Sequence, residues 1–488
     1  MNQPEVTFWE DIRAAFQKIW GYEDFRPPQG EIIHSLLSQQ DTLVVMPTGG
    51  GKSICFQLPA LLQTGLTLVV SPLVALMENQ VQELRDRHLS AALIHSELPP
   101  HHRRQTLQAL EQQQLRLLYL SPETLLSPPV WQRLRQPQLK INGLILDEAH
   151  CLVQWGETFR PAYRRLGAVR PALLKSKPSG TQIAIAAFTA TADPQAQQTI
   201  QQVLQLKQPQ IFRQNPHRPN LHLKVQIAWT PRGRRQQLSQ FIQARPKAGL
   251  VYVRTRRDSE SLAQWLGQLG YVTGAYHAGL SPDERRAIEA SWLSGAMPFV
   301  ICTCAFGMGI NKHDVRWIVH FHAPLLLSEY VQEIGRAGRD GKPSEALLLM
   351  SEPTGWLDPE DKQRQQFFEN QERQQWQMAR QLTNRIPVQG DIDTVVRQFK
   401  QGAVALSLLH NMGQLEWQDP FHYVIKRSAD SQVLTQDKAR QDMTRYLKTK
   451  GCRWKFLLEA FGFAQDAEAL KPGCGHCDHC LPRQLQPD

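Results

Sequence analysis

No stretch of this sequence is long and apolar enough to cross a bilayer, and its first ten residues lack the apolar core of a signal peptide. Cysteine is scarce over most of the chain, and Cys55, Cys151, Cys302 and Cys304 lie in apolar or motif contexts that favour reduced thiols. No internal repeat is found at the level of motifs. We therefore expect a cytoplasmic protein, nucleoid-associated if the source is bacterial.

Length and composition indicate a folded protein of several domains. The 488 residues are too many for one core, so about three domains are expected. A hydrophobic content of 41% and a charged content of 20% fit a folded chain. The 55 Lys and Arg against 45 Asp and Glu give a net charge of +10, which favours a polyanionic partner. Charge alone does not identify nucleic acid, because many basic proteins bind none.

Short apolar runs alternate with helical stretches in two series, one from about residue 40 to 191 and one from 221 to 350. The expected buried strands are residues 43–45, 66–70, 115–119, 143–146, 249–253, 298–302 and 317–321. This alternation predicts an α/β fold of two tandem parallel-sheet lobes. A ligand is expected between them, since crevices between domains are preferred sites.

A glycine-rich turn follows the first strand and precedes a helix. Its residues are Thr48, Gly49, Gly50, Gly51, Lys52 and Ser53. Glycines let backbone N–H groups surround phosphates at the positive end of a helix. Lys52 is expected to reach the β- and γ-phosphates of ATP, and Ser53 to bind Mg²⁺. Met46 stands where the full motif has its first glycine, and a flexible turn without a ligand is the alternative.

Two carboxylates follow another apolar strand, at Asp147 and Glu148. A strand that ends in a carboxylate is how such lobes hold Mg²⁺, a role predicted for Asp147. Glu148 is then placed to polarise the attacking water as a general base. His150 could carry the nucleotide state to the neighbouring lobe. A solvated loop is the alternative, but the glycine-rich turn in the same lobe favours catalysis.

Positive charge for the transition state is predicted from the second lobe. Arg336 and Arg339 are three residues apart on a helix that Ser328 can cap, so they are expected to share a face with Gln332 nearby. An arginine finger contributes on the order of 10³–10⁵ in rate, and only when the lobes close. Hydrolysis would thus be tied to lobe motion. A basic surface turn is the alternative.

The acidic motif and the arginine segment together resemble superfamily 2 helicases, and three further stretches resemble the RecQ DNA helicases. These stretches are residues 21–29, 155–163 and 305–312. The resemblance covers about residues 8–350 and resumes at the C-terminal cysteines. It implies two RecA-like lobes that use ATP and Mg²⁺. It also implies unwinding of DNA with 3′-to-5′ polarity, driven by translocation on a single strand, in recombination and repair.

The resemblance assigns further roles near the nucleotide. Gln29 would hydrogen-bond the adenine edge, while Tyr22 and Arg26 flank its faces. Residues 189–191 resemble the third helicase motif, which links hydrolysis to strand movement. The fourth motif, residues 252–256 with Arg254 and Arg256, is more basic than is usual in the family, which could strengthen a phosphate contact; in the alternative the extra charge is incidental.

An aromatic-rich loop is the main predicted DNA contact. Trp155 and Phe159 would stack on bases at roughly 1–3 kcal/mol per base, with Arg160 on a phosphate. In the alternative, both aromatic side chains fill the lobe core. The family usually has a His-Asp pair where this chain has Glu157 and Thr158, which puts the coupling of DNA binding to hydrolysis in doubt. Further backbone contacts are expected at Ser71, Ser121, His277 and Thr303.

The remaining cysteines lie near the C-terminus with metal-binding spacing. Three form a Cys-x-x-Cys-x-x-Cys cluster: Cys474, Cys477 and Cys480. Tetrahedral Zn²⁺ needs a fourth ligand, for which Cys452, His476 and His479 compete. The resemblance pairs a cysteine on a helix with the cluster, which selects Cys452. We expect a structural zinc site worth on the order of 10–16 kcal/mol of folding energy. An iron–sulfur cluster is the alternative.

Only eight residues follow Cys480, too few for the winged helix that usually follows the zinc site in the resembled family. A relocated, winged-helix-like insert is instead predicted at 388–428, with a helix capped by Asp391, a second helix at 403–412 and a hairpin at 415–425. We hypothesise that this insert grips duplex DNA, and a compact spacer without DNA contact is the alternative. The expected domains are residues 1–215, 216–350, 351–440 and 441–488.

Two other functions remain open at this point. One is an ATPase of the same architecture that acts on RNA, and the other is a zinc-bearing protein that binds DNA structures and unwinds them weakly. The expected partner is DNA, as single strands and duplex junctions, with no membrane. We expect a monomer and predict no particular protein partner.

Overall fold

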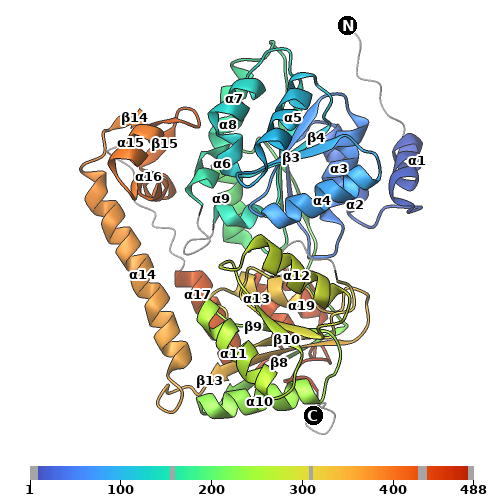
Figure 1. Cartoon of the computed structure of the whole chain (residues 1–488), viewed down its shortest axis with the longest axis vertical. Coiled ribbons are helices and arrows are strands. Elements are labelled where there is room, and N and C mark those ends of the chain that lie inside the picture. The colour runs from blue at the N-terminus through green and yellow to red at the C-terminus, as the bar shows by residue number, and fades with distance from the viewer. Residues whose placement is uncertain (1–8, 154–159, 307–311, 427–436, 482–488) are drawn as a thin grey trace.

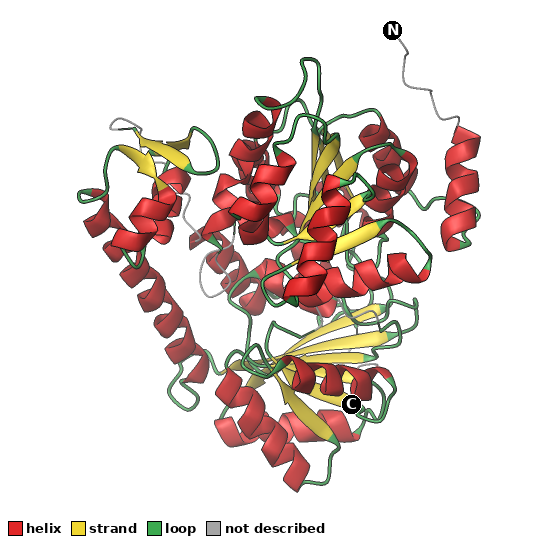
Figure 2. Cartoon of the chain, turned by 45° about the horizontal axis from the view of Figure 1, so that its top comes forward, coloured by secondary structure: helices red, strands yellow, loops and turns green. Residues whose placement is uncertain are grey.

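Two parallel β-sheets with helices packed on them form the two lobes of the protein in the computed structural model (Figures 1 and 2). The structure describes residues 9–153, 160–306, 312–426 and 437–481. Within these ranges no helix has both the length and the apolar character needed to span a membrane.

The first lobe contains a seven-stranded sheet in the order β3-β4-β2-β5-β6-β1-β7, with every pair parallel. Its strands are β1 Thr42–Val45, β2 Leu66–Val70, β3 Ala91–Ile94, β4 Leu117–Leu120, β5 Ile141–Leu146, β6 Ala184–Thr189 and β7 Gln210–Arg213. Its helices are α1 Trp9–Trp20, α2 Gln29–Leu37, α3 Lys52–Leu62, α4 Val74–Asp86, α5 Pro100–Glu111, α6 Pro122–Leu125, α7 Pro128–Leu134, η1 Ala149–Leu152, η2 Pro161–Ala168, α8 Val169–Leu174 and α9 Pro194–Leu204.

The second lobe contains a six-stranded parallel sheet in the order β10-β11-β9-β12-β13-β8. Its strands are β8 Leu221–Ala228, β9 Gly249–Tyr252, β10 Thr273–Tyr276, β11 Phe299–Cys302, β12 Trp317–His320 and β13 Ser344–Ser351. Its helices are α10 Pro231–Gln243, α11 Arg256–Gln268, α12 Pro282–Leu293 and α13 Leu327–Ile334. The predicted class of two parallel-sheet lobes is confirmed.

The seven strands that the sequence predicted are all buried along their whole length, and strands covered on both faces are nearly continuous in Leu, Val and Ile. Six other strands of the lobes were missed, among them β8 and β13, which lie at the two ends of the second series. β6 and β10 are rich in Ala, Gly and Thr, and edge strand β7 is largely exposed, so none carries a strong apolar run. β3 is a four-residue strand whose first two residues are alanines, and only pairing with β4 defines it.

A long helix and a small sheet follow the second lobe. Helix α14 (Glu360–Thr383) runs from the lower lobe to a small domain beside the upper one (Figure 1). That domain, which we call the insert module (residues 388–426), contains β14 Gln389–Asp391, α15 Ile392–Gln398, α16 Gly402–Asn411, β15 Leu415–Trp417 and β16 His422–Ile425. Asp391 caps α15 by accepting the Thr394 N–H at 3.0 Å, as predicted. Strand β14 was not predicted.

The last helices return to the second lobe. They are α17 Asp437–Lys448, α18 Arg453–Ala460 and α19 Ala464–Ala469. Trp454 is buried in the core of the second lobe, and its Nε1 donates to the Leu221 carbonyl at 3.1 Å. The cysteine segment is thus attached to the strand β8 that opens this lobe.

Arg234 joins the second lobe to the start of α14. Its side chain and that of Asp358 are both 0% exposed and lie 2.8 Å apart. Arg234 also contacts Asp361 at 3.1 Å and donates to the Phe321 carbonyl at 2.9 Å. A buried ion pair supported by these hydrogen bonds makes the origin of α14 rigid.

Replacement of Arg234 by Met should destabilise the second lobe by about 3–5 kcal/mol, because Asp358 would remain buried without its cation. Chemical denaturation monitored by circular dichroism measures this change. The exposed neighbour Arg232, changed to Met, is the control and should leave the midpoint unchanged. Equal stability of the Arg234→Met variant would show that the pair does not hold α14.

Candidate nucleotide and DNA site

The glycine-rich turn forms a cradle between β1 and α3. Gly49 and Gly51 have φ of 84° and 77°, in the left-handed region that favours glycine. A Cβ on Gly51 would lie 2.3 Å from Nε2 of Gln29, so no side chain fits there. Gly51 is the N-cap of α3, which starts at Lys52, so the N-terminal N–H groups of this helix lie at the turn. This geometry suits an anionic phosphate group.

Lys52 has a buried ammonium group with no hydrogen-bond partner in the described part of the chain. A buried charge without a partner is costly, so such a group indicates a ligand of opposite charge. A phosphate bound in the turn would supply it. The glycine-rich turn and Lys52 therefore fit a nucleoside triphosphate.

Two buried carboxylates lie at the end of β5, close enough to Lys52 to feel its charge. Burial and the neighbouring Glu148 raise the pKa of Asp147. Burial alone would also raise the pKa of Glu148, but Lys52, His150 and Arg336 together lower it, so Glu148 is ionised at neutral pH. Asp147 and the Ser53 hydroxyl are oxygen ligands of the kind that Mg²⁺ prefers, so these residues fit that ion.

His150 connects the acidic motif to the end of β6. Its Nδ1 lies 3.2 Å from a carboxylate oxygen of Glu148 and 3.3 Å from the Thr189 hydroxyl. Burial opposes its charge, but Cys151 and Glu148 raise the pKa of His150. Both contacts lie within the first lobe, and the one to Thr189 connects this imidazole to residues 189–191.

The predicted adenine-reading residues lie beside the glycine-rich turn. Gln29 is buried; its Oε1 accepts the Arg26 N–H at 3.0 Å and its Nε2 donates to the Gly50 carbonyl at 3.0 Å. The amide retains one lone pair and one hydrogen for a ligand. Tyr22 is 52% exposed and packs on Phe16 with ring centroids 5.7 Å apart, and Arg26 is exposed.

The second lobe reaches the same turn. The Thr48 hydroxyl donates to the Gly335 carbonyl at 2.9 Å, and a Cβ on Gly49 would lie 3.7 Å from Cγ of Arg339. Burial, followed by the charges of Arg336 and Arg218, lowers the pKa of Arg339 to about 10. Several buried cations therefore gather where Lys52 lies. A polyanion would relieve their mutual repulsion.

Gln332 lies at the same interface. Together with Thr48 and Thr191 it lines a small cavity between the lobes. The segment predicted to supply the arginines therefore lies at the glycine-rich turn. Within it, Gln332 lies on α13, whereas Arg336 and Arg339 follow that helix.

Two details of the arginine segment were wrong. Ser328 does not cap α13, because the helix begins at Leu327 and the Glu329 carboxylate instead accepts the Leu325 N–H at 3.3 Å. The helix ends at Ile334, so Arg336 and Arg339 lie in the turns after it and not on one helical face.

The small residue Gly338 serves packing within the second lobe. Its φ is 60°, and a Cβ there would lie 2.5 Å from Nδ2 of Asn220. Asn220 donates to the Gly338 carbonyl at 2.8 Å, and Arg218 donates to the same oxygen. The sequence did not indicate Arg218 and Asn220. They hold the turn that contains Arg336 and Arg339 to the segment that joins the lobes.

A buried ion network holds α13, and the sequence missed it. Arg254 is only 9% exposed, and its guanidinium lies 3.2 Å from Glu333 and 3.5 Å from Glu329. Nε2 of His320 lies 2.7 Å from the same Glu333 oxygen. The charge of Arg254 is therefore paired with two carboxylates of α13. The four-residue spacing of Glu329 and Glu333 on one helix was the available signal.

Part of the predicted DNA surface is described. Trp155 and Phe159 lie outside the described residues, as do residues 307–311 of the fifth motif. Arg160 is half-exposed, and its guanidinium lies 3.4 Å from Glu123 on α6. The Ser71 hydroxyl is buried without a hydrogen-bond partner in the described structure, whereas the Ser121 hydroxyl caps α6.

His277 and Thr303 follow the neighbouring strands β10 and β11, whose last residues pair. The two residues therefore lie at one edge of the sheet. His277 is buried, its Nε2 lies 2.9 Å from Glu260, and its Nδ1 accepts the Gly279 N–H at 3.2 Å. Thr303 donates its own N–H to the Tyr276 carbonyl at 3.1 Å.

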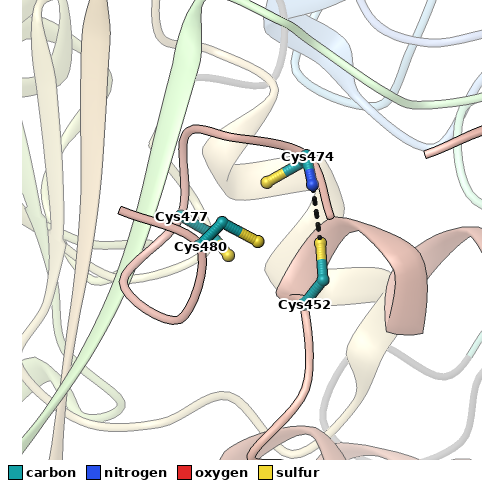
Figure 3. Close-up of side chains that lie close together, drawn as sticks. All are labelled: Cys452, Cys474, Cys477 and Cys480. Atoms are coloured by element: carbon teal, nitrogen blue, oxygen red, sulfur yellow. Dashed lines mark hydrogen bonds between the residues drawn. The ribbon is translucent and has the colours of Figure 1, made fainter. Parts of the chain in front are cut away.

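Four cysteines converge at the C-terminal end of the described chain (Figure 3). The sulfur atoms of Cys452, Cys474, Cys477 and Cys480 all lie within 4.8 Å of one another. The Cys474 N–H donates to the Cys452 sulfur at 3.3 Å. Four thiolates at this spacing fit tetrahedral Zn²⁺.

The competing histidines take other roles. Nδ1 of His476 lies 2.6 Å from the Cys474 carbonyl, and Nε2 of His479 lies 3.1 Å from the Arg453 guanidinium. Asp478 fastens the segment to β8: its N–H donates to the Leu223 carbonyl and its carboxylate accepts the Val225 N–H, both at 2.9 Å.

Three family models match the chain. Residues 26–200 match the DEAD/DEAH box helicase family, residues 233–341 the helicase conserved C-terminal domain, and residues 414–481 the RecQ zinc-binding family. The fold is similar to that of the helicase Lhr of Mycobacterium smegmatis bound to ssDNA and AMP-PNP, with a TM-score of 0.58, 18% identity, and coverage of 89% of this chain and 61% of that one. It is also similar to Mss116p bound to ssRNA and AMP-PNP, with a TM-score of 0.59, 16% identity, and coverage of 72% and 75%.

Curated relatives are closer in sequence. The ATP-dependent DNA helicase RecQ of Synechocystis sp. is 54% identical over 475 residues, which cover 97% of this chain and 98% of the relative. The ATP-dependent DNA helicase RecQ of Haemophilus influenzae is 38% identical over 72% of this chain and 56% of its own length. The chain thus spans about half of the latter protein but nearly all of the former. It belongs to the RecQ family of ATP-dependent DNA helicases.

Proposed function

We propose that the chain hydrolyses ATP between its lobes, moves 3′ to 5′ along single-stranded DNA and unwinds duplexes during recombination and repair. This proposal rests on one observation: Arg339 of the second lobe approaches the glycine-rich turn, where the buried ammonium group of Lys52 has no hydrogen-bond partner in the described chain. The name of the Synechocystis relative supports DNA as the substrate.

Binding would begin at the cradle. Backbone N–H groups of the glycine turn and the Lys52 ammonium would hold the phosphates, while Gln29 uses its remaining donor and acceptor on the adenine edge. Tyr22 and Arg26 flank the base from the exposed side of that turn. Ser53 and Asp147 would hold Mg²⁺, which when bound neutralises charge on the β- and γ-phosphate oxygens.

Hydrolysis would use the ionised Glu148. Its carboxylate orients a water that attacks the γ-phosphorus, the bond to the β-phosphate oxygen breaks, and ADP and phosphate result. Charge that develops on the phosphoryl oxygens is stabilised by Lys52 and by Arg336 and Arg339 from the other lobe. Gln332 would help position the γ-phosphate at the lobe interface.

Movement would follow from opening and closing of the lobes. The Thr48–Gly335 hydrogen bond joins the two lobes at the glycine-rich turn. A γ-phosphate bound in that turn would therefore lie at the contact between the lobes, and its release would weaken this contact. Arg160 in the first lobe and His277 and Thr303 in the second would hold the DNA strand on either side. Trp155 and Phe159 would stack on its bases and report its presence to Glu148.

We also propose that the four cysteines hold one structural Zn²⁺. The ion would fix the turn at residues 474–480 to α18 and, through Asp478, to β8. The cluster is attached to the second lobe through α18 and β8, so its role would be to maintain the fold of this lobe.

The Lys52→Ala variant should lose ATP-dependent unwinding yet retain DNA binding, because it removes only the phosphate contact. Strand displacement and fluorescence anisotropy measure the two properties. The control is Lys18→Ala, an exposed lysine on α1 that should change neither. Unwinding by the Lys52→Ala variant at the normal rate would contradict the assigned site.

Polarity is tested with duplexes that carry a single-stranded tail on either strand. A 3′-tailed duplex should be unwound with ATP, and a 5′-tailed one should not. Samples without ATP are the control, since opening costs ~1.4 kcal/mol per base-pair step and binding alone cannot sustain it. Preferential opening of 5′-tailed DNA would refute the polarity, and stronger ATPase stimulation by RNA than by DNA would refute the substrate.

The Cys477→Ser variant should lose bound zinc and melt at a lower temperature, since such sites contribute on the order of 10–16 kcal/mol to folding. Elemental analysis and thermal melting measure this. Cys304→Ser, a change at an exposed cysteine outside the cluster, should keep one zinc per chain. Iron with labile sulfide in the purified protein would show that the cluster holds another metal.

A further inference from the structure

The insert module has the element order of a winged helix. The end of α14 is followed by β14, α15, α16, β15 and β16, and the sheet order is β14-β16-β15 with both pairs antiparallel. In this arrangement α16 takes the place of the second helix of a helix-turn-helix, and the turn at 418–421 that of the wing. Such helices usually enter the major groove of DNA.

Helix α16 lacks the chemistry for DNA. Its sequence from Gly402 to Asn411 contains no Lys or Arg, and its one Asn is buried, whereas contacts to phosphates and base edges rely on exposed side chains of these kinds. Most of its residues are buried, which is expected of a helix that is apolar all round and covered on more than one side. One side is covered by α14, and the other needs a second partner.

That second partner is segment η2 of the first lobe. The Ser407 hydroxyl lies 3.4 Å from the Pro161 carbonyl, and Ala168 belongs to the apolar core of the insert module. His410 is half-buried, and desolvation together with the charge of Arg164 lowers its pKa to about 3. A neutral imidazole beside a buried guanidinium is suited to protein packing and not to a phosphate.

The turn in the place of the wing is also covered by the first lobe. Phe421 packs edge-on against Trp131 of α7, with ring centroids 5.4 Å apart. Nη1 of Arg165 donates to the Pro420 carbonyl at 3.2 Å. Asp391 and Asp393 of the module face the charge of the same arginine. Both surfaces through which such a domain would hold DNA therefore contact protein.

The other end of α14 belongs to the second lobe, because Arg234 binds Asp358 and Asp361 there. The helix thus connects an anchor on one lobe to a docked module on the other. The docked segment, η2, begins directly after Arg160 and residues 154–159. A movement of α14 relative to the first lobe would therefore act on η2, which follows the predicted DNA loop in the sequence.

We propose that the insert module is an intramolecular brace: it grips residues 161–168 of the first lobe with the surface that a winged helix normally offers to DNA. The brace fixes residues 161–168, which directly follow the predicted DNA loop in the sequence, and stimulation of ATP hydrolysis by DNA depends on this fixed segment. This assignment replaces the hypothesis of a duplex-DNA grip, and its kinetic part rests on the proposed function.

Two variants weaken the docked surface from opposite sides. Phe421→Ala acts within the module, and Arg165→Ala acts from the first lobe and so leaves the module's own core intact. Each should lower the DNA-stimulated ATPase rate about three- to tenfold, with the basal rate and duplex affinity unchanged. The double variant should lose little more than the singles, because both changes disrupt one interface.

The matched control removes exposed cations of the same module, with Arg397→Ala and Lys400→Ala. The brace predicts no effect of this control. Weaker duplex binding in the control, with normal stimulation in the Phe421→Ala and Arg165→Ala variants, would show a DNA grip and overturn the brace.

Hydrogen exchange tests the docking without reference to ATP. Backbone amides of residues 161–168 should exchange faster in both docking variants and remain protected in the control. Unchanged protection in both variants would overturn the brace. A lack of DNA stimulation in the unaltered chain would instead refute the proposed function, and the exchange result would still decide the docking.

Discussion

The buried ammonium of Lys52 is the feature on which the rest of this structure depends. It lies at the start of α3 without a hydrogen-bond partner in the described chain, and its charge acts on the carboxylates of Asp147 and Glu148. Arg336 and Arg339 add further buried positive charge from the other lobe. On the proposed function, a bound triphosphate with its metal would satisfy these groups together, and lobe closure would then depend on the nucleotide.

A second requirement follows from the first, because buried guanidinium groups act only if their backbone is held in place. In the second lobe, Arg254 and His320 both contact the carboxylate of Glu333. Asn220 and Arg218 donate hydrogen bonds to the carbonyl of Gly338. These contacts fix the arginine turn to the sheet and to the segment between the lobes. The charges that meet the nucleotide are therefore supported by a second layer of polar contacts.

The regions that follow the lobes in the sequence are also held in place by contacts with the lobes. The cysteine segment is fastened to β8 of the second lobe through Asp478, and the insert module packs on η2 of the first. Helix α14 joins the two, with Arg234 as its anchor. A helicase that changes the angle between its lobes needs elements that cross them, and α14 with the insert module is such an element.

Short-range chemistry made much of this protein predictable. Glycines before Lys52, carboxylates after an apolar strand and cysteines at Cys-x-x-Cys spacing each act within a few residues, so the sequence by itself determined the glycine-rich turn, seven of the parallel strands and three of the four cysteines of the cluster. The tertiary structure alone decided which distant groups meet. Cys452 joins the other cysteines, Arg254 faces Glu333, the arginines follow α13 instead of lying on it, and α16 packs on the first lobe. Such pairings depend on burial and on the order of strands in space, and neither is recorded in local sequence spacing.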